Sequence, residues 1–550
     1  MATHKNANGQ TIVLAYVAVV VVTVLGGALL NHGFTTNRDA AVQQLQADVL
    51  YMAEGGLEDA IGRFANAIAN FQIDPNVVQY PAAGVLTTTF TGGGSASSTV
   101  SEAEPSPRAV ADPDGVSIFE KAYRVRATVQ HPTGALGITL NQIVKRRIIY
   151  TFQHAVFYDG DLEWLPGPDM TLSGRVHSNG DIYLGTHAIL TVDSQYLRTA
   201  GNLYNRRKDD PGAPMGGVVQ IKKAGTNPAQ FPTMSGLDSD DATWAADSQS
   251  RWGGTVKSGV HGVTARAVPV IGSIAPGGFY DQRADLKVIN GQLVQGGVVL
   301  VEGRDLPPGT VMTADDFYNN RERKHVRMTT IDLRKLAGHF DANNDGVEDP
   351  PGRNGNRFTN RLPANGLLYA NGRATPATHQ PGVRLIRGAE IARAGGLTVV
   401  SPVPVYLQGD YNTVSKKPTA VIADAVNLLS NNWRDSTSLS GLERRPASST
   451  TVNAAFIAGI TETTPSRYNG GLENYPRFHE NWTNKTLSIT GSFVSLWNSQ
   501  IATGNWVYGN PQYTAPLRNW NYDASFSSGT SLPPFTPYAV EMVKGAWWKE

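Results

Sequence analysis

An uncharged apolar run near the N-terminus constrains this 550-residue chain more than any other feature. Between Gln10 and Leu30 the polar residues are Gln10, Thr11 and Thr23, and none of the run is charged. About 20 apolar residues in a helix cross the hydrocarbon core of a bilayer, whereas the apolar part of a cleaved secretory signal usually has about 7–15. The run therefore predicts a retained single-pass anchor. A signal cleaved near Ala28 is the alternative.

The polar chain that follows the run keeps a helical rhythm. Apolar side chains recur at intervals of three to five residues, at Ala41, Leu45, Val49, Met52, Leu57, Ile61, Phe64 and Ile68. No proline interrupts the chain from Met1 to Ile73, so the spacing predicts one amphipathic helix that continues from the membrane into the aqueous phase. We expect this helix over residues 10–70, with its transmembrane half at residues 10–30. An ordinary anchor with a juxtamembrane coiled coil is the alternative.

Two short motifs in this region resemble the type IV pilin-like precursors. A polar leader, residues 1–9, ends in Gly9, and the apolar helix starts at once with Gln10. The segment "YMAEGGLEDAI" (Tyr51–Ile61), which contains Glu54, is similar to a segment of the PilX-type minor pilins. The resemblance implies that a prepilin peptidase cuts after Gly9, and that Gln10 becomes an N-methylated first residue. It also implies that other pilin-like subunits pack against the helix.

Leu14 departs from the pattern of the major pilins. It would be the fifth mature residue, where they carry a glutamate, and Gln10 stands where they usually carry phenylalanine. In that family the glutamate is thought to neutralise the N-terminal ammonium of the preceding subunit, because an unpaired charge inside a bilayer is costly. A subunit that enters first has no predecessor to neutralise. Leu14 therefore favours a filament tip or an assembly initiator, and an anchor that never polymerises is the alternative.

The rest of the chain has the composition of a β protein. The whole chain contains 57 glycines and 32 prolines, and only 17% of its residues are charged, which favours short strands and many turns over long helices. We expect linker loops and a small antiparallel sheet over residues 71–155, followed by a large β-rich domain over residues 156–550. Its short apolar runs between Gly, Asn and Asp suit a β-solenoid or an irregular β-sandwich. Few helices are expected there, near Asp315–Asn320 and Asp332–Leu336.

One acidic loop has the pattern of a calcium site. In "DANNDGVED" (Asp341–Asp349), oxygen-bearing side chains alternate and a glycine follows the third of them. Such a glycine permits the sharp turn that aims successive oxygens at Ca²⁺. The predicted ligands are Asp341, Asn343, Asp345, the backbone carbonyl of Val347, and Asp349. Gly352 stands where an EF-hand has its last glutamate, so the loop is closer to those of extracellular repeats, and an Asx-rich turn that binds nothing is the alternative.

Several function classes lack their sequence signals. The net charge of +1 offers no electrostatic basis for binding nucleic acid, and the absence of cysteine excludes disulfides and thiolate chemistry. The chain has no GxSxG, Walker A or HExxH motif. His177 has acidic neighbours in Asp159, Asp161 and Asp181, but all of these residues accompany turn signals such as Asn179-Gly180.

These observations predict a minor pilin-like or pseudopilin-like structural protein of a type IV pilus or a related secretion system, and not an enzyme. We expect it at the filament tip or as an assembly initiator, where it could also bind a surface or receptor. It would cross the bacterial inner membrane once with its large domain in the periplasm, or stand outside the cell after assembly. The alternative is a membrane-anchored envelope enzyme or binding protein that acts on polysaccharide.

Overall fold

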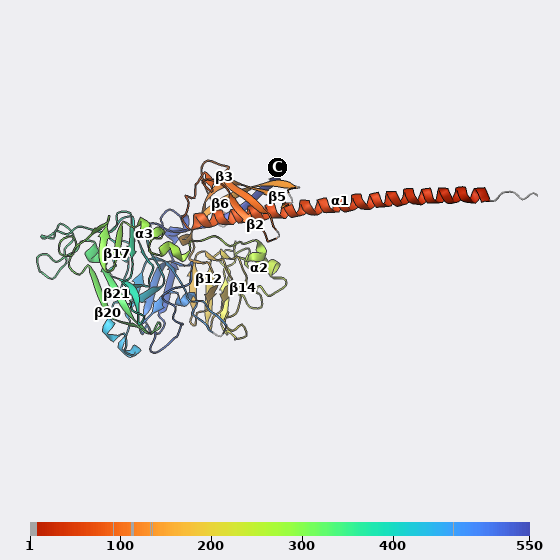
Figure 1. Cartoon of the computed structure of the whole chain (residues 1–550). Helices are drawn as coiled ribbons and strands as arrows, with labels where there is room; N and C mark the ends of the chain where they lie inside the picture. The colour runs from red at the N-terminus through yellow and green to blue at the C-terminus, as the bar shows by residue number, and fades with distance from the viewer. Residues whose placement is uncertain (1–7, 92, 112–114, 133, 135, 466) are drawn as a thin grey trace, which may run out of the picture.

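A long helix, a small sheet and a large β body make up the computed structural model, which describes residues 8–91, 93–111, 115–132, 134, 136–465 and 467–550 (Figure 1). Helix α1 runs unbroken over Asn8–Ala69, 62 residues or roughly 93 Å at 1.5 Å per residue. Its first half projects away from the body as a bare rod, and its second half lies on the small sheet (Figure 1). The predicted fold class, a long N-terminal apolar helix before a mostly β region with few helices, is confirmed.

The sheet beside α1 is antiparallel and has seven strands in the order β1-β3-β5-β6-β33, with β2 paired to β3 and β4 to β5. The strands are β1 (Gln79–Tyr80), β2 (Leu86–Thr89), β3 (Ser95–Glu102), β4 (Arg108–Ala111), β5 (Ser117–Gln130), β6 (Gly137–Tyr150) and β33 (Tyr538–Lys549). One face packs on α1, where Phe64, Tyr123 and Leu140 are fully buried. The sheet thereby covers the apolar stripe of the second half of the helix.

The structure differs from the prediction in how this sheet is composed. The Ser- and Thr-rich stretch expected as linker contributes β3, whose Ala96, Ser98 and Val100 are buried in alternation against α1. Their small side chains let the helix approach closely, which hydrophobicity alone does not reveal. The C-terminal strand β33 pairs with β6, so residues 538–549 belong to this sheet and not to the large domain.

The large body is a β-solenoid whose rungs stack mainly through parallel strands, which decides between the two predicted architectures. Its first part has three rungs of three strands each: β7 (Val156–Tyr158), β8 (Leu162–Trp164), β9 (Met170–Ser173), β10 (Val176–Ser178), β11 (Ile182–Leu184), β12 (Ile189–Asp193), β13 (Leu197–Thr199), β14 (Leu203–Tyr204) and β15 (Val218–Ile221). Register pairs Val156 with Val176 and Val176 with Leu197, so a rung takes 20 or 21 residues. Strand β16 (Val256–Lys257) ends this part.

The second part stacks longer and less regular rungs. One face carries β17 (Leu286–Ile289), β22 (Leu367–Ala370), β24 (Leu397–Ser401), β26 (Thr419–Ala423), β29 (Ala455–Ala458) and β31 (Thr486–Ser495). Another carries β20 (Val311–Asn319), β21 (Lys324–Asp332), β23 (His379–Ile386), β25 (Val405–Gln408), β27 (Val426–Leu429) and β30 (Arg477–Phe478). Beyond β17 the first of these sheets continues into β18 (Gln292–Gln295) and β19 (Val298–Val299), and its β31 also pairs with β28 (Thr450–Val452) and β32 (Leu517–Tyr522). The body also contains helices α2 (Trp244–Trp252), α3 (Phe279–Arg283) and α4 (Leu333–Leu336).

The two parts join into one stack although they are far apart in sequence. Strand β31, near the end of the chain, pairs in parallel with β7, the first strand of the solenoid, matching Phe493 to Val156 and Ser495 to Tyr158. A single hydrophobic core runs through both parts and includes Trp164 and Phe456. We call this β31–β7 junction the seam, because it joins the first rung of the solenoid in sequence to the last one.

Candidate functional site

The first half of α1 offers a bare apolar surface. Its most apolar 18-residue window has a mean hydropathy of 2.7, and none of that window is buried against the rest of the chain. Ile12, Tyr16 and Leu29 are each more than two-thirds exposed. An apolar surface of this size is unstable in water, so it requires a bilayer or other apolar helices around it.

The residues predicted for processing and assembly lie on this helix. Residues 1–7 of the predicted leader fall outside the described residues, whereas Gly9 and Gln10 lie in the first turns of α1. Leu14 is 68% exposed and belongs to the bare apolar surface. Glu54 is also exposed, one residue beyond the fully buried Ala53. Whether these residues act in cleavage or assembly stays a prediction.

The glycine pair inside "AEGGLED" has a packing role. A Cβ on Gly56 would lie 2.4 Å from Ala96 Cβ of β3, and one on Gly55 would lie 3.0 Å from the ring of Phe90. Ser98 Oγ donates a hydrogen bond of 3.1 Å to the Gly56 carbonyl, which ties helix and sheet together at this point. The motif that resembles the minor pilins is thus where α1 touches its own sheet.

The acidic loop is a tight turn built from its own side chains. Asp341 accepts backbone N–H groups from Asp345 at 3.1 Å and Gly346 at 3.0 Å, and Asn343 Nδ2 donates to Asp345 Oδ2 at 2.8 Å. Gly346 has φ +86°, the left-handed conformation that the calcium pattern demands of it. Val347 is 62% exposed and donates its N–H to Asp345 Oδ1 at 2.8 Å.

Asp349 pairs its backbone with Phe340, the residue before Asp341, through two hydrogen bonds of 3.0 Å. It is 7% exposed, and its Oδ1 accepts from Asn354 Nδ2 at 2.7 Å. Its Oδ2 is buried and meets no hydrogen-bond donor in the described part of the chain. Across the described residues, no three His, Asp or Glu side chains gather closely enough to hold a metal ion. Calcium at this loop stays a prediction, and the unmet Asp349 oxygen is the atom that favours it.

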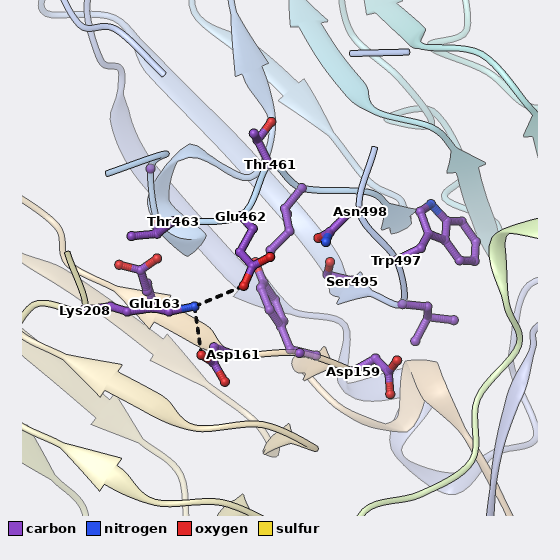
Figure 2. A pocket seen from close by; sticks show the side chains of 16 residues that line it. Asp159, Asp161, Glu163, Lys208, Thr461, Glu462, Thr463, Ser495, Trp497 and Asn498 are labelled. Atoms are coloured by element: carbon purple, nitrogen blue, oxygen red, sulfur yellow. Dashed lines mark ion pairs between the residues drawn. The ribbon is translucent and has the colours of Figure 1, made fainter. Parts of the chain in front are cut away.

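A second acidic group lines a cavity at the seam (Figure 2). The cavity has a volume of about 210 Å³, and its walls are the corner after β7, the loop after β29 and the end of β31. Lys208 Nζ lies 2.9 Å from Asp161 Oδ2 and 3.6 Å from Glu462 Oε1, so the carboxylates of Asp161 and Glu462 converge on one ammonium (Figure 2). Asp159 Oδ1 accepts from Asn179 Nδ2 at 2.7 Å.

Glu163 is the most deeply buried carboxyl group of the cavity lining. It is 8% exposed, and its Oε2 has no hydrogen-bond partner among the described residues. Burial raises the pKa of the Glu163 carboxyl to about 7, and Thr463 and Lys208 offset part of that effect. Tyr158, on the same wall, is 2% exposed and its hydroxyl likewise lacks a partner in the described structure. A buried polar group without a hydrogen-bond partner destabilises the folded state by about 1–3 kcal/mol. Glu163 Oε2 and Tyr158 Oη both carry this cost.

His177 lies in the solenoid core instead of in this cavity. Its ring stacks on Phe157 with centroids 5.0 Å apart, and its Nε2 lies 3.2 Å from Asn179 Oδ1. Burial, assisted by the charge of Arg266, lowers the pKa of His177 well below its usual range, which keeps the ring neutral. The ring therefore serves as a packing element between rungs, and of its predicted acidic neighbours Asp159 and Asp161 line the seam cavity.

Sequence reasoning missed Glu163, Lys208 and Glu462. One available signal was "DGDLE", in which acidic residues at 159, 161 and 163 alternate into a buried strand. Acidic side chains are rarely buried without a partner, so that alternation marks a site. Lys208 and Glu462 carry no such signal, because only the folded solenoid brings them beside it.

Comparisons with known proteins give little further information. No family model and no curated protein matches this chain. Among solved structures, the competence-associated pilin ComZ from Thermus thermophilus is similar over 92% of this chain and 97% of its own, with 12% sequence identity and a TM-score of 0.27. At that TM-score the two folds differ too much for anything about this chain's function to be taken from ComZ.

Proposed function

We propose that this chain is a pilin-like structural subunit, held in the bacterial inner membrane by α1 and then drawn into a filament. The observation that carries the proposal is the division of α1 into two halves. Residues 12–30 are bare and apolar, whereas Val49–Ala69 pack on the chain's own sheet. A helix that needed only to anchor would not have to continue rigidly for 62 residues into the body. A rigid helix keeps the bare half available for a bilayer first and for other subunit helices later.

The position in the filament follows from the size of the body and from Leu14. The solenoid is much wider than α1 and lies beside the end of the helix, so repeated copies along a narrow filament would collide (Figure 1). Leu14 places an apolar side chain where a polymerising subunit would need a carboxylate to neutralise the ammonium of its predecessor. Both features favour a tip or initiator position, in which this subunit enters first and presents the solenoid outward to a surface or receptor.

Processing provides the direct test. We expect prepilin peptidase to remove residues 1–9, so that mass spectrometry of the membrane-extracted protein finds an N-methylated Gln10 first. A Gly9→Leu variant should retain the leader in otherwise identical cells, which controls for unspecific trimming. An intact leader in the wild-type protein, or a mature start near Leu29, would contradict the proposal.

We also propose that the Asp341–Asp349 loop binds Ca²⁺ weakly outside the cytoplasm. Side-chain oxygens of Asp341, Asn343, Asp345 and Asp349 and the backbone carbonyl of Val347 would coordinate the Ca²⁺. The buried Oδ2 of Asp349 has no hydrogen-bond donor among the described residues. Binding would replace the turn's internal hydrogen bonds by metal bonds and hold the loop on the solenoid. The chain has no disulfides, and an ion that binds only the folded state would raise its free energy of unfolding as the calcium concentration rises.

A further inference from the structure

The seam cavity lies where two distant parts of the chain must hold together. Asp159 N donates to the Ser495 carbonyl at 2.8 Å, and Leu165 N donates to Glu473 Oε2 at 3.1 Å. Each bond joins the first solenoid rung to residues more than 300 positions later. The cavity lies at this junction and is lined from one side by Tyr158–Gly160 and from the other by Ile460–Thr463. Whatever occupies it touches both sides of the junction.

Two buried oxygen atoms of the cavity lack hydrogen-bond partners in the described structure. Glu163 Oε2 and Tyr158 Oη are buried without partners among the described residues, and both residues line the cavity. Thr461, Thr463 and Ser495 also line it, and their oxygens can accept further bonds. Buried polar groups in folded proteins are nearly always paired, so two orphans in one cavity indicate a missing occupant that donates hydrogen bonds.

The charged side chains that line the cavity indicate the charge of the ligand that it would bind. Its lining holds the four carboxyl groups of Asp159, Asp161, Glu163 and Glu462 against the single ammonium of Lys208. The other charged or titratable groups around Glu163 are Tyr158, Arg207, Asp209, Tyr468 and Glu473, and Arg207 is already paired with Asp209 at 2.9 Å. The surplus is negative, which excludes an anion and favours a cation.

We propose that the seam cavity binds the primary ammonium group of an alkylamine, with Glu163 and Tyr158 as its principal partners, and that the bound amine holds the two parts of the solenoid together. An ammonium brings three N–H donors on a narrow stem. It would donate to Glu163 Oε2 and Tyr158 Oη and add the positive charge that Lys208 alone does not supply. A volume of about 210 Å³ accommodates the ammonium and the first carbons of its chain. The same chemistry is carried by free diamines and by lysine side chains of a partner polypeptide.

The proposal predicts a pH dependence whose sign can be worked out. The cavity holds Glu163 largely neutral at low pH, since burial raises the pKa of its carboxyl to about 7. An ammonium binds the ionised form better, while the ligand's own charge is constant below about pH 9. Affinity should therefore rise by about tenfold between pH 6 and pH 8, because the ionised fraction of a group with that pKa rises by about this factor.

The test uses the full-length protein in detergent, in phosphate buffer that contains EDTA, to remove divalent cations, and no primary amine. The melting temperature and isothermal calorimetry are followed with 1,5-diaminopentane, with the uncharged 1,5-pentanediol and with tetramethylammonium, which has charge but no donors. We expect only the diamine to bind and to raise the melting temperature. Glu163→Gln should abolish that response, and Glu443→Gln, an exposed change elsewhere on the solenoid, should leave it intact.

The outcomes separate the possibilities. Equal binding of the diol, an unchanged response in Glu163→Gln, or no response to the diamine at pH 8 would each overturn the proposal. If N-acetyl-lysine amide binds more tightly than the diamine, the natural ligand is a lysine of a polypeptide, and the reverse order indicates a free polyamine. Hydrogen exchange of residues 486–495 should slow when the amine binds, which an ammonium at an unrelated surface site would not cause. None of these results depends on whether α1 enters a filament.

Discussion

Alanine at Gly56 is expected to weaken the docking of α1 on its sheet, although alanine is the better helix former. The added Cβ would lie 2.4 Å from Ala96 Cβ, 3.4 Å from Ser98 Oγ and 3.5 Å from Ala127 Cβ. The first distance is far inside van der Waals contact, and a methyl group attached to a strand backbone cannot swing aside. Gly62, six residues later on the same helix, provides the matched control, because a Cβ there meets nothing within 4 Å.

The magnitude follows from two opposing effects. Replacing glycine by alanine inside a helix gains about 1 kcal/mol, and both variants share this gain. Forcing a methyl group into a packed interface costs about 1–3 kcal/mol, and only Gly56→Ala carries this cost. We therefore expect Gly62→Ala to stabilise the docked helix by about 1 kcal/mol relative to the wild type. The docked helix of Gly56→Ala should be less stable than that of Gly62→Ala by about 1–3 kcal/mol.

Hydrogen exchange of the amides of residues 49–69, measured by mass spectrometry, reports the local opening free energy. The expected difference in opening free energy corresponds to a protection factor that is about 5- to 150-fold lower in Gly56→Ala than in Gly62→Ala, since 1.4 kcal/mol changes an equilibrium constant tenfold. If both variants gain protection equally, the close approach of helix and sheet at Gly56 is refuted, and with it the packing account of the glycine pair.

Three further predictions address the acidic loop, the buried carboxyl and the filament. Replacing both Asp341 and Asp345 by Ala should abolish any Ca²⁺-dependent rise in melting temperature, whereas Asp210→Ala, an exposed change outside the loop, should preserve it. A wild-type protein without such a rise would contradict the calcium proposal. Because burial raises the pKa of Glu163 to about 7, the folded state binds a proton that the unfolded chain releases at lower pH, so stability falls as pH rises from about 4.5 to 7. Urea unfolding should show the wild type losing about 3 kcal/mol relative to Glu163→Gln between pH 4.5 and 8, and parallel pH profiles of the two proteins would exclude this. Immunogold labelling of the solenoid should mark filament ends, and regular labelling along filament shafts would contradict the tip position.

Local patterns predicted some elements correctly and failed where distant contacts intervene. The helix expected near Asp332–Leu336 exists as α4, and Asp332 caps it by accepting from Lys335 N at 3.0 Å. The helix expected near Asp315–Asn320 is wrong, because residues 315–319 lie in β20 and Asn320 lies in the turn after it. There Phe317 is fully buried against the rings of Tyr406 and Trp433, contacts that come from rungs about a hundred residues later. Those contacts favour the strand over any local preference for a helix.

The solenoid repeat was hard to see for a physical reason. Its first strands are only three or four residues long. Strands β7 and β8 are buried throughout, and the alternation of buried and exposed residues in β9 covers only four residues, so no strand there is long enough to show a clear period. Later rungs carry long insertions between strands, which blur any period. The alternation of acidic residues at 159, 161 and 163 is visible in the sequence. That these residues line a cavity depends on residues 460–463 and 495–498, which the fold places opposite them.

Features that depend on neighbours in sequence were determined by the sequence alone: the unbroken helix, its bare apolar half, the tight acidic turn and the β character of the remainder. These follow from backbone hydrogen bonding and side-chain periodicity over a few residues. Only the tertiary structure decided that β33 returns to β6, that β31 closes on β7, and that Glu163, Lys208 and Glu462 surround one cavity. Parallel rungs pair residues tens to hundreds of positions apart, and no local pattern specifies which partner such a strand will find.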